Sequence, residues 1–200
     1  MMKAMIGCEF SGVVRNAFNR KDGWEAVSVD LLPAEDNGQH WQCDVVEAVL
    51  SQRWDFICLH PPCTYLTVSS NAHYAEGKPR FHKRKESAQW TANLWSIATA
   101  RCERVCLENP VGVLPRYTGM KPSQYIHPHW FGHPHSKKTA LYLRGLEPLE
   151  PTNLLPLPPS GRWENQTPSG QSNLGPSPDR WKERSRTYQG IADAMANTWA

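Results

Sequence analysis

The 200-residue sequence has no run of about eighteen apolar residues, the length that crosses a membrane as a helix. Its first residues lack the long apolar region and small-residue cleavage site of a signal peptide. It has six cysteines but no Cys-x-x-Cys pair, and several of them lie inside apolar runs. We therefore expect a reduced, cytoplasmic protein rather than one held together by disulfides.

Neither sign of charge is in large excess, because 22 lysines and arginines oppose 19 acidic residues and leave a formal net charge of +3. Such a balance permits a nucleic acid as partner without requiring one. Hydrophobic residues make up 40% of the chain, so a core can form. The length suits one α/β domain and is short for two.

Prolines are scarce in the first part of the chain, since thirteen of the seventeen lie between Pro110 and Pro178. This division predicts a regular part followed by a loop-rich part and a helical tail. We expect a core over residues 1–145 and a proline-rich loop segment over residues 146–186. A C-terminal helix over residues 187–200 is expected to pack back on the core.

Strands and helices are expected to alternate in the regular part. Apolar runs predict strands over residues 3–8, 25–30, 55–59 and 104–107, and the spacing of apolar residues predicts helices over 13–20, 45–52 and 84–100. This order indicates an α/β fold with a mostly parallel sheet and right-handed crossovers. In such sheets a ligand lies beyond the carboxyl ends of the strands, so the residues that follow each strand are the functional candidates.

The first strand leads into a turn with the sequence GCEFSG. Its glycines, Gly7 and Gly12, allow a backbone to approach a ligand at a helix N-terminus, and Phe10 is placed to stack on an adenine ring. The turn matches neither G-x-G-x-x-G nor a phosphate loop, which argues against a triphosphate. An ordinary glycine-containing turn between a strand and a helix is the alternative.

Two aspartates complete the outline of a nucleoside pocket. Asp30 ends the second strand, where a carboxylate can accept hydrogen bonds from both ribose hydroxyls of an adenosine-containing cofactor. Asp44 is placed to reach an adenine amino group. Helix capping or turn formation is the alternative for each, because aspartate favours both positions.

The sharpest motif follows the third strand and reads His60-Pro61-Pro62-Cys63-Thr64. Its prolines fix the backbone and so hold the Cys63 side chain in a defined direction. A thiolate in such a place can add reversibly to an electron-poor ring carbon. A small buried cysteine is the alternative, but a polar loop rather than an apolar strand follows Cys63.

The fourth strand runs into Glu108-Asn109-Pro110. A glutamic acid at this strand end can hydrogen-bond the ring nitrogen and the exocyclic amine of cytosine, and can protonate the ring as a thiol adds. A solvent-exposed glutamate in a turn is the alternative.

Taken together, these motifs resemble the DNA (cytosine-5) methyltransferase family, and most closely its short phage-type members. The Pro-Pro-Cys loop with the downstream Glu-Asn pair is similar to the family's catalytic signatures, and Phe10-Ser11-Gly12 to its cofactor turn. Residues 134–139 and the C-terminal helix are similar to further family segments. The resemblance implies a Rossmann-like α/β fold, S-adenosylmethionine as cofactor, and methyl transfer to carbon 5 of cytosine in DNA.

The resemblance also implies roles for individual residues. Residues 1–145 become the catalytic core, and residues 146–186 stand in place of a target-recognition domain. Cys63 adds to carbon 6 of cytosine, and Glu108 supports protonation at nitrogen 3. The residues expected to bind the cofactor are Gly7, Glu9, Phe10, Gly12, Asp30, Asp44 and Pro61. Those expected to bind the substrate are Pro62, Thr64, Asn109, Lys83, Arg84, Lys137 and Lys138.

Because a cytosine must leave the base stack to meet a thiol, the expected partner is DNA with a flipped or single-stranded cytosine. Positive charge after the catalytic loop is a candidate for phosphate contacts, with a solvated helix start as the alternative. This charge comes from Lys78, Arg80, Lys83, Arg84 and Lys85.

Histidines and tryptophans stand out in the second part of the chain. Four histidines fall within residues 127–135, but their spacing matches no zinc signature, so no metal site is expected. Trp163 and Trp181 lie in polar sequence and are candidates for stacking on a base.

Two other functions also fit the sequence. One keeps this chemistry but acts on a free pyrimidine nucleotide, or uses a related one-carbon donor, since only about forty residues separate Gly145 from Arg186. The other is a catalytically inactive protein that binds DNA. It draws support from Lys137 and Thr139, which replace the arginines of the family's Pro-Gln-x-Arg-x-Arg stretch and lose their bidentate contacts.

Overall fold

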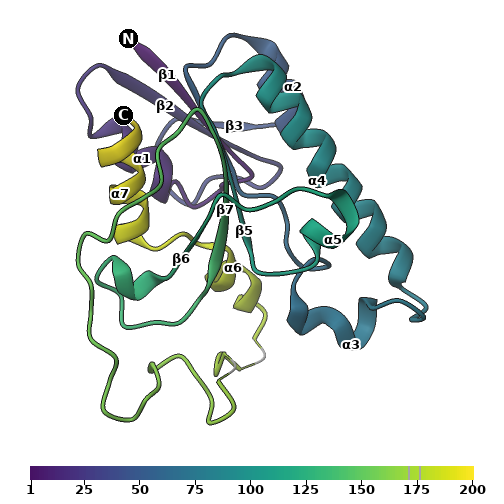
Figure 1. The fold of residues 1–200 in the computed structure, drawn as a ribbon. Coiled ribbons are helices and arrows are strands. Elements are labelled where there is room, and N and C mark those ends of the chain that lie inside the picture. Colours follow the sequence, from purple (N-terminus) through teal and green to yellow (C-terminus); the bar gives the residue numbers. More distant parts are fainter. Residues whose placement is uncertain (171, 176) are drawn as a thin grey trace.

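Within the described part of the chain, residues 1–170, 172–175 and 177–200 of a computed structural model, seven strands form one sheet in the order β3-β2-β1-β4-β5-β7-β6 (Figure 1). The strands are β1 (Met2–Gly7), β2 (Trp24–Asp30), β3 (His40–Gln42), β4 (Phe56–Leu59), β5 (Val105–Pro110), β6 (Gln124–Ile126) and β7 (Thr139–Arg144). Strands β1 to β5 pair in parallel, whereas β7 is antiparallel to both β5 and β6. The predicted Rossmann-like α/β fold with a mostly parallel sheet is confirmed.

Helices cover both faces of the sheet (Figure 1). One face carries α1 (Val13–Asn19) and α7 (Gln189–Trp199), and the other carries α2 (Val45–Ser51), α4 (Phe81–Arg101) and α5 (Leu114–Thr118). The connections contain the short helices α3 (Asn71–Tyr74) and α6 (Arg180–Ser185) and the 3₁₀ turns η1 (Val68–Ser70) and η2 (Pro128–Trp130).

Strand residues divide between two cores because successive side chains of a strand point to opposite faces. In β4, Phe56 and Cys58 join the core beneath α1 and α7, whereas Ile57 and Leu59 join the core beneath α2 and α4. All four side chains are fully buried. A strand buried on both faces reads as a continuous apolar run, which explains why the sequence predicted it.

The eight predicted strands and helices are all found, each with ends within three residues of the predicted ones. The sequence did not predict β3, β6, α3, α5 or α6. These elements have three to six residues, and so are too short for a repeating hydrophobic pattern to be recognised.

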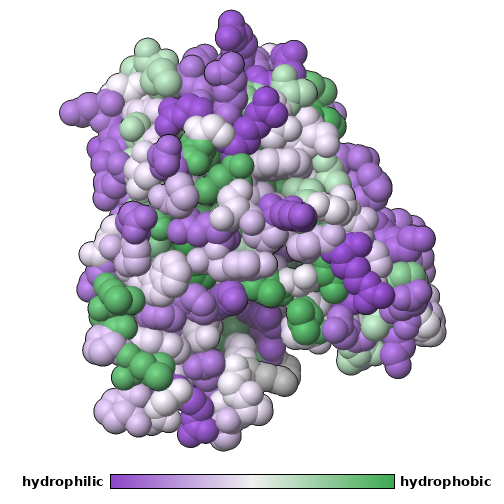
Figure 2. Space-filling view, in the orientation of Figure 1, coloured by the Kyte–Doolittle hydropathy of each residue, from purple (hydrophilic) through white to green (hydrophobic). Residues whose placement is uncertain are grey.

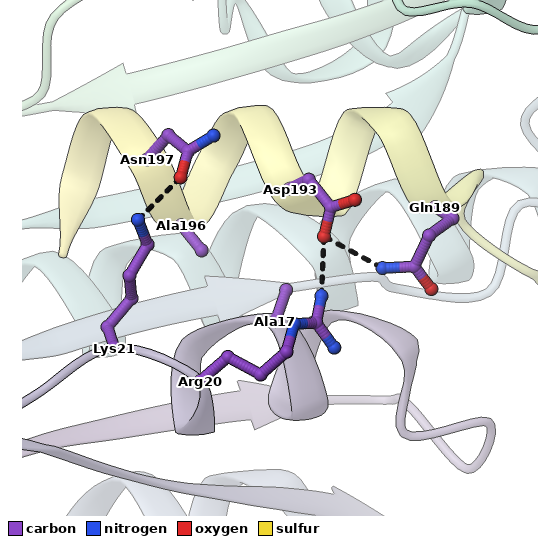
Figure 3. A pocket seen from close by; sticks show the side chains of 7 residues that line it. All are labelled: Ala17, Arg20, Lys21, Gln189, Asp193, Ala196 and Asn197. Carbon is purple, nitrogen blue, oxygen red and sulfur yellow. Dashed lines mark hydrogen bonds and ion pairs between the residues drawn. The ribbon is translucent and has the colours of Figure 1, made fainter.

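The C-terminal helix α7 packs against α1, and polar side chains bridge the rim of this contact (Figure 3). Arg20 pairs with Asp193, and the ammonium group of Lys21 donates to Asn197. These residues line a polar surface pocket between the two helices. Since its charged groups already satisfy one another, this pocket is a packing feature and not a candidate for chemistry.

Hydrophilic side chains cover most of the face in Figure 2, and hydrophobic ones form small separate groups. Large hydrophobic side chains that are exposed include Leu154 and Leu157 of the proline-rich segment. Among the helices of the described residues, none has the length and apolar character needed to cross a bilayer.

Trp199 anchors α7, because it is 1% exposed and its ring nitrogen donates to the carbonyl of Glu147 at 2.9 Å. Replacing a buried tryptophan by alanine leaves a cavity and costs about 3–5 kcal/mol. We therefore expect Trp199→Ala to lower the free energy of unfolding by that amount in urea denaturation. Trp90→Ala is the matched control, since Trp90 is 38% exposed on α4. Equal losses in the two variants would contradict the packing of α7.

Candidate active site

The carboxyl ends of β1, β2 and β4 open into a cavity of about 630 Å³. Small-molecule sites commonly measure about 300–1,000 Å³. The residues at the strand ends that line it are Cys8, Phe10, Asp30, His60, Pro62 and Cys63. Its other walls come from the segment 64–74 and from α6, which brings part of the proline-rich segment to the strand ends.

The turn after β1 is built around Glu9, which caps α1. The carboxylate of Glu9 accepts hydrogen bonds from the backbone N–H groups of Val14 at 2.7 Å and Arg15 at 3.2 Å. Burial raises the pKa of Glu9, and the opposing effects of His60 and these backbone bonds only partly offset the rise. Because Glu9 occupies the N-terminus of α1, this helix offers no place for a phosphate group.

The two glycines of the turn make room for the protein's own side chains. A Cβ atom on Gly7 would lie 2.6 Å from Val45 and 2.9 Å from Leu59, so the missing side chain lets α2 approach the sheet. Gly12 has a φ of +70°, and a Cβ atom there would clash with the guanidinium group of Arg15. Neither residue lines the cavity.

The two aspartates differ in position. Asp30 lines the cavity, and its Oδ1 accepts from the N–H of Leu32 at 2.9 Å. Asp44 lies outside the lining and caps α2 by accepting from the N–H of Val46 at 2.7 Å, as the capping alternative describes. Both carboxylates affect Cys8 in the turn after β1. Burial raises the pKa of the Cys8 thiol to about 12, and the negative charges of Asp30 and Asp44 contribute to this rise.

Two of the three aromatic side chains proposed for stacking lie at the cavity. Phe10 and Trp181 of α6 both line it, with ring centroids 5.7 Å apart and planes inclined by 49°. Trp163 is elsewhere. It is 7% exposed and stacks on the ring of His129 at 4.7 Å, so it is not free to receive a base.

The Pro-Pro-Cys loop is fastened to the neighbouring strand end. Asn109 is 1% exposed and donates from Nδ2 to the carbonyl of Pro61 at 3.1 Å. These two residues were expected to contact substrate and cofactor, but the structure places them against each other and outside the cavity lining. Pro62, Cys63 and Thr64, which follow, do line the cavity.

Arg84 is buried, unlike the neighbouring basic residues of α4 with which it was grouped. It is 1% exposed, and its guanidinium group donates to four groups of the segment 65–71. These are the carbonyls of Tyr65 and Thr67, Ser70 Oγ and Asn71 Oδ1, at 2.7–3.2 Å. Arg84 therefore holds a cavity wall and is not available to a phosphate. Lys83 and Lys138, the latter 4.5 Å above the ring of Tyr125, are exposed.

Lys137 lies close to both predicted catalytic residues. Its ammonium group donates to the carbonyl of Arg184 at 2.9 Å and so ties the start of β7 to α6. The positive charge of Lys137 acts to lower the pKa of both Cys63 and Glu108.

Cys63 follows the end of β4, and Glu108 lies in the last part of the neighbouring strand β5. Burial raises the pKa of the Cys63 thiol, and the negative charge of Glu108 raises it further, while Lys137 and Arg184 oppose both effects. The two residues that the sequence assigned to one base thus interact electrostatically, although Cys63 lines the cavity and Glu108 does not.

His60, which the sequence analysis did not assign a role, joins these groups. Its Nδ1 lies 3.2 Å from Oε2 of Glu108, and its Nε2 lies 3.4 Å from Sγ of Cys58. Burial lowers the pKa of His60, but Cys58 and Glu108 raise it well above its ordinary value. Burial raises the pKa of Glu108, but His60, Lys137 and Thr139 together bring it below its ordinary value. His60 and Glu108 thus lie within ion-pair distance of each other and carry opposite charges when His60 is protonated.

The strand register explains this pair and is the signal that would have found it. Cys58 of β4 is the partner of Cys106 of β5. Side chains two residues apart share a face of a sheet, so His60 and Glu108 lie on the same face one step further. The sequence predicted where the two strands end, but not the register in which β4 pairs with β5.

The four histidines of residues 127–135 pair with rings and backbone instead of converging. The rings of His127 and His129 lie 4.9 Å apart, and His133 Nε2 accepts from the N–H of Gly190 at 2.9 Å. Across the described ranges, no three His, Cys, Asp or Glu side chains are arranged to hold a metal ion. All six cysteines are free thiols.

No protein-family model and no curated protein sequence matches the chain. One similar solved structure is described as a DNA modification methyltransferase encoded within an E. coli prophage, with 11% identity and a TM-score of 0.44, covering 78% of this chain and 53% of that one. Another is the Entamoeba histolytica methyltransferase EhMeth, with 13% identity and a TM-score of 0.48, covering 74% and 54%. A delta-N METTL16 methyltransferase domain has 9% identity and a TM-score of 0.39, covering 74% of each chain. The chain spans about half the length of the first two structures, and these likenesses concern the fold alone.

We expect Arg84→Met to loosen the cavity wall, because it leaves the carbonyls of Tyr65 and Thr67 without their buried donor. Hydrogen exchange measured by mass spectrometry is expected to accelerate at least about tenfold over residues 65–74, while the strands keep their protection. Lys85→Met, at an exposed position of the same helix, is the matched control. Unchanged exchange over residues 65–74 in Arg84→Met would contradict the role given to Arg84.

The pKa of Cys63 is expected to rise further in Arg184→Gln, because the substitution removes a positive charge that lowers it. At pH 8 a smaller fraction of Cys63 is then thiolate, so alkylation by iodoacetamide should slow about two- to fivefold at low salt. Peptide mass spectrometry reads the rate at Cys63 separately from the other cysteines. Lys182→Gln, on the same helix, is the control. Faster alkylation of Cys63 in Arg184→Gln, or an equal change in both variants, would contradict this electrostatic arrangement.

Proposed function

We propose that the protein is a methyltransferase that moves a methyl group from S-adenosylmethionine to carbon 5 of cytosine in DNA. One observation carries the proposal. The Pro-Pro-Cys loop with Cys63 follows β4, the Glu-Asn motif with Glu108 stands in the parallel neighbour β5, and the charge of Glu108 acts on the Cys63 thiol.

The charge around the cavity supports two ligands of opposite sign. Negative charge gathers around the turn after β1, from Glu9, Asp30 and Asp44. Positive charge gathers around Cys63, from Lys137 and Arg184, with Arg180 also on the cavity wall. A sulfonium cation suits the first region and a nucleotide phosphate the second.

The residues present fit S-adenosylmethionine in particular. Phe10 and Trp181 offer aromatic surfaces for an adenine ring, and Asp30 can accept hydrogen bonds from ribose hydroxyls. The carboxylate of Glu9 at the N-terminus of α1 disfavours a cofactor with a diphosphate in that place. S-adenosylmethionine, when bound, supplies an electrophilic methyl group for carbon 5.

Carbon 5 of cytosine is a poor nucleophile until Cys63 acts on the ring. Cys63 first gives its thiol proton to solvent. Its thiolate then bonds to carbon 6, the electron pair of the carbon 5–carbon 6 double bond moves to join carbon 5 to carbon 4, and the pair of the carbon 4–nitrogen 3 double bond moves to nitrogen 3, which takes a proton. Glu108 holds this edge of the base by giving that proton to nitrogen 3 and accepting from the exocyclic amine. A base then removes the proton of carbon 5, the ring double bond returns, and Cys63 leaves as a thiolate.

The substrate reaches Cys63 as a cytosine outside the base stack. We assign the catalytic core to residues 1–145 and the place of a target-recognition domain to residues 146–186, from which α6 reaches the cavity. Lys83 and Lys138 are exposed and remain candidates for contacts with backbone phosphates. Pro62 and Thr64, beside Cys63 on the cavity wall, are candidates for contacts with the flipped nucleotide.

Transfer of labelled methyl from S-adenosylmethionine to DNA tests this function, with mass analysis of the nucleosides. We expect 5-methyldeoxycytidine with the wild-type protein and with Cys43→Ala, a control cysteine outside the cavity, and none with Cys63→Ala. The reason is that only Cys63 supplies the nucleophile that activates the ring. Label on adenine or on the cytosine amine, or equal label with Cys63→Ala, would contradict the proposal.

The same assay with deoxycytidine monophosphate separates two substrates. Label on the nucleotide but not on DNA favours the free-nucleotide alternative. Salt-dependent DNA binding with no methyl transfer to either substrate favours an inactive DNA-binding protein.

A further inference from the structure

We infer that His60 is a positioning residue that acts through Glu108. Its imidazole holds the proton that nitrogen 3 of cytosine takes when Cys63 adds to the ring. This inference rests on the function proposed above and extends it to a residue outside the Pro-Pro-Cys and Glu-Asn motifs. The juxtaposition that carries it is the contact of 3.2 Å between Nδ1 of His60 and Oε2 of Glu108.

Glu108 needs such a partner because its own carboxyl group is ionised. The groups around Glu108 bring its pKa below the ordinary value, so at neutral pH the carboxylate holds no proton to give. Nitrogen 3 nevertheless has to be protonated as the Sγ–carbon 6 bond forms. A proton bound between His60 and Glu108 meets this need without a second acid.

The surroundings of the pair keep the proton in place. The His60 side chain is 7% exposed and that of Glu108 13% exposed, so little water competes for the hydrogen bond between them. Low exposure strengthens such a charge-assisted bond. Of the pair, His60 lines the cavity and Glu108 does not.

Two other titratable groups face the imidazole of His60. Cys58, on the same strand, lies 3.4 Å from Nε2, and Glu9 faces it from the turn after β1. A hydrogen bond with Cys106 and burial raise the pKa of Cys58 well above its ordinary value, so Cys58 stays a neutral thiol at neutral pH. Glu108 is thus the acidic side chain in direct hydrogen-bond contact with His60.

The groups on the far side of Glu108 come from β7 and from the catalytic loop. The hydroxyl of Thr139 donates to the carbonyl of Lys137 at 3.1 Å, Thr139 and Lys137 both lower the pKa of Glu108, and the charge of Glu108 acts on Cys63. None of these three supplies the proton. Thr139 is a weak acid, Cys63 gives its proton to solvent before it attacks, and Lys137 holds a backbone carbonyl.

No proton is gained or lost by the protein over one complete reaction. At rest His60 is a cation and Glu108 an anion, and Cys63 gives its thiol proton to solvent in the cavity so that it attacks as a thiolate. As Cys63 attacks carbon 6, the Nδ1–H bond of His60 breaks, a proton moves to Glu108, and the carboxyl group passes a proton to nitrogen 3. His60 is then neutral, and Glu108 is again an anion beside a protonated base. When the thiolate leaves, the proton returns along the same path.

Exchange of the carbon 5 hydrogen of cytosine in DNA with deuterated water tests this inference without a methyl donor. The adduct formed by Cys63 takes deuterium at carbon 5 and collapses, and mass spectrometry measures the product. His60→Gln keeps a hydrogen-bond donor for Glu108 but cannot hold the proton. We expect its exchange rate at pH 7.5 to fall about a hundredfold, within the range for loss of a general acid.

The pH profile distinguishes proton supply from structural support. In His60→Gln the proton must come from Glu108 alone, so the maximum of exchange should move toward pH 5–6, where carboxyl groups begin to hold protons. His82→Gln, an exposed histidine on α4, should keep the wild-type profile. A wild-type profile in His60→Gln, or an equal loss at every pH, would overturn the inference.

A second measurement does not depend on turnover. Nuclear magnetic resonance of labelled histidine should show His60 as a cation at pH 7.5 in the wild-type protein and as the neutral form in Glu108→Gln. A neutral His60 in the wild type would overturn the inference and leave the proposed function intact. No exchange at carbon 5 in the wild type, with DNA or with deoxycytidine monophosphate, would instead contradict the proposed function and the inference with it.

Discussion

The parallel pairing of β4 with β5 is the constraint on which the site depends. Cys58 pairs with Cys106 and Leu59 with Leu107, deep between two cores, so neither strand can shift its register without exposing apolar side chains. Beyond the last paired residues, the same register sets His60 beside Glu108. The proline pair and the bond from Asn109 to Pro61 then direct the chain back toward the cavity at Cys63. The sheet thus positions the reactive groups before any ligand is bound.

The strand order also determines which charged side chains surround the cavity. The end of β2 and the turn after β1 contribute carboxylates, while the start of β7 and the helix α6 contribute lysine and arginine to the neighbourhood of Cys63. Since α6 belongs to the proline-rich segment, this segment is part of the site in addition to connecting the sheet to α7. The acidic side chains around the turn after β1 suit the sulfonium group of the proposed donor, and the basic side chains around Cys63 suit a nucleotide phosphate.

Much of the fold was predictable, because buried parallel strands and amphipathic helices leave a regular pattern of apolar residues. The sequence also predicted Cys63 and Glu108 as site residues, because each belongs to a polar motif that follows an apolar run, and their roles stay predictions. Arg84 was not understood, because a buried arginine with four partners and an exposed one look alike in a sequence. The capping role of Glu9 and the pairing of His60 with Glu108 depend on contacts between distant segments, which local patterns do not encode.

The central claim is that Cys63 and Glu108 act on opposite sides of one pyrimidine. A crystal structure of the protein with a methyl donor and an oligonucleotide that contains 5-fluorocytosine tests it most directly, because fluorine at carbon 5 prevents release of the thiol after methyl transfer. The account predicts a covalent bond between Sγ of Cys63 and carbon 6, with the carboxyl group of Glu108 on nitrogen 3 and the exocyclic amine. A base bound away from Cys63, or one that Glu108 does not touch, would contradict it.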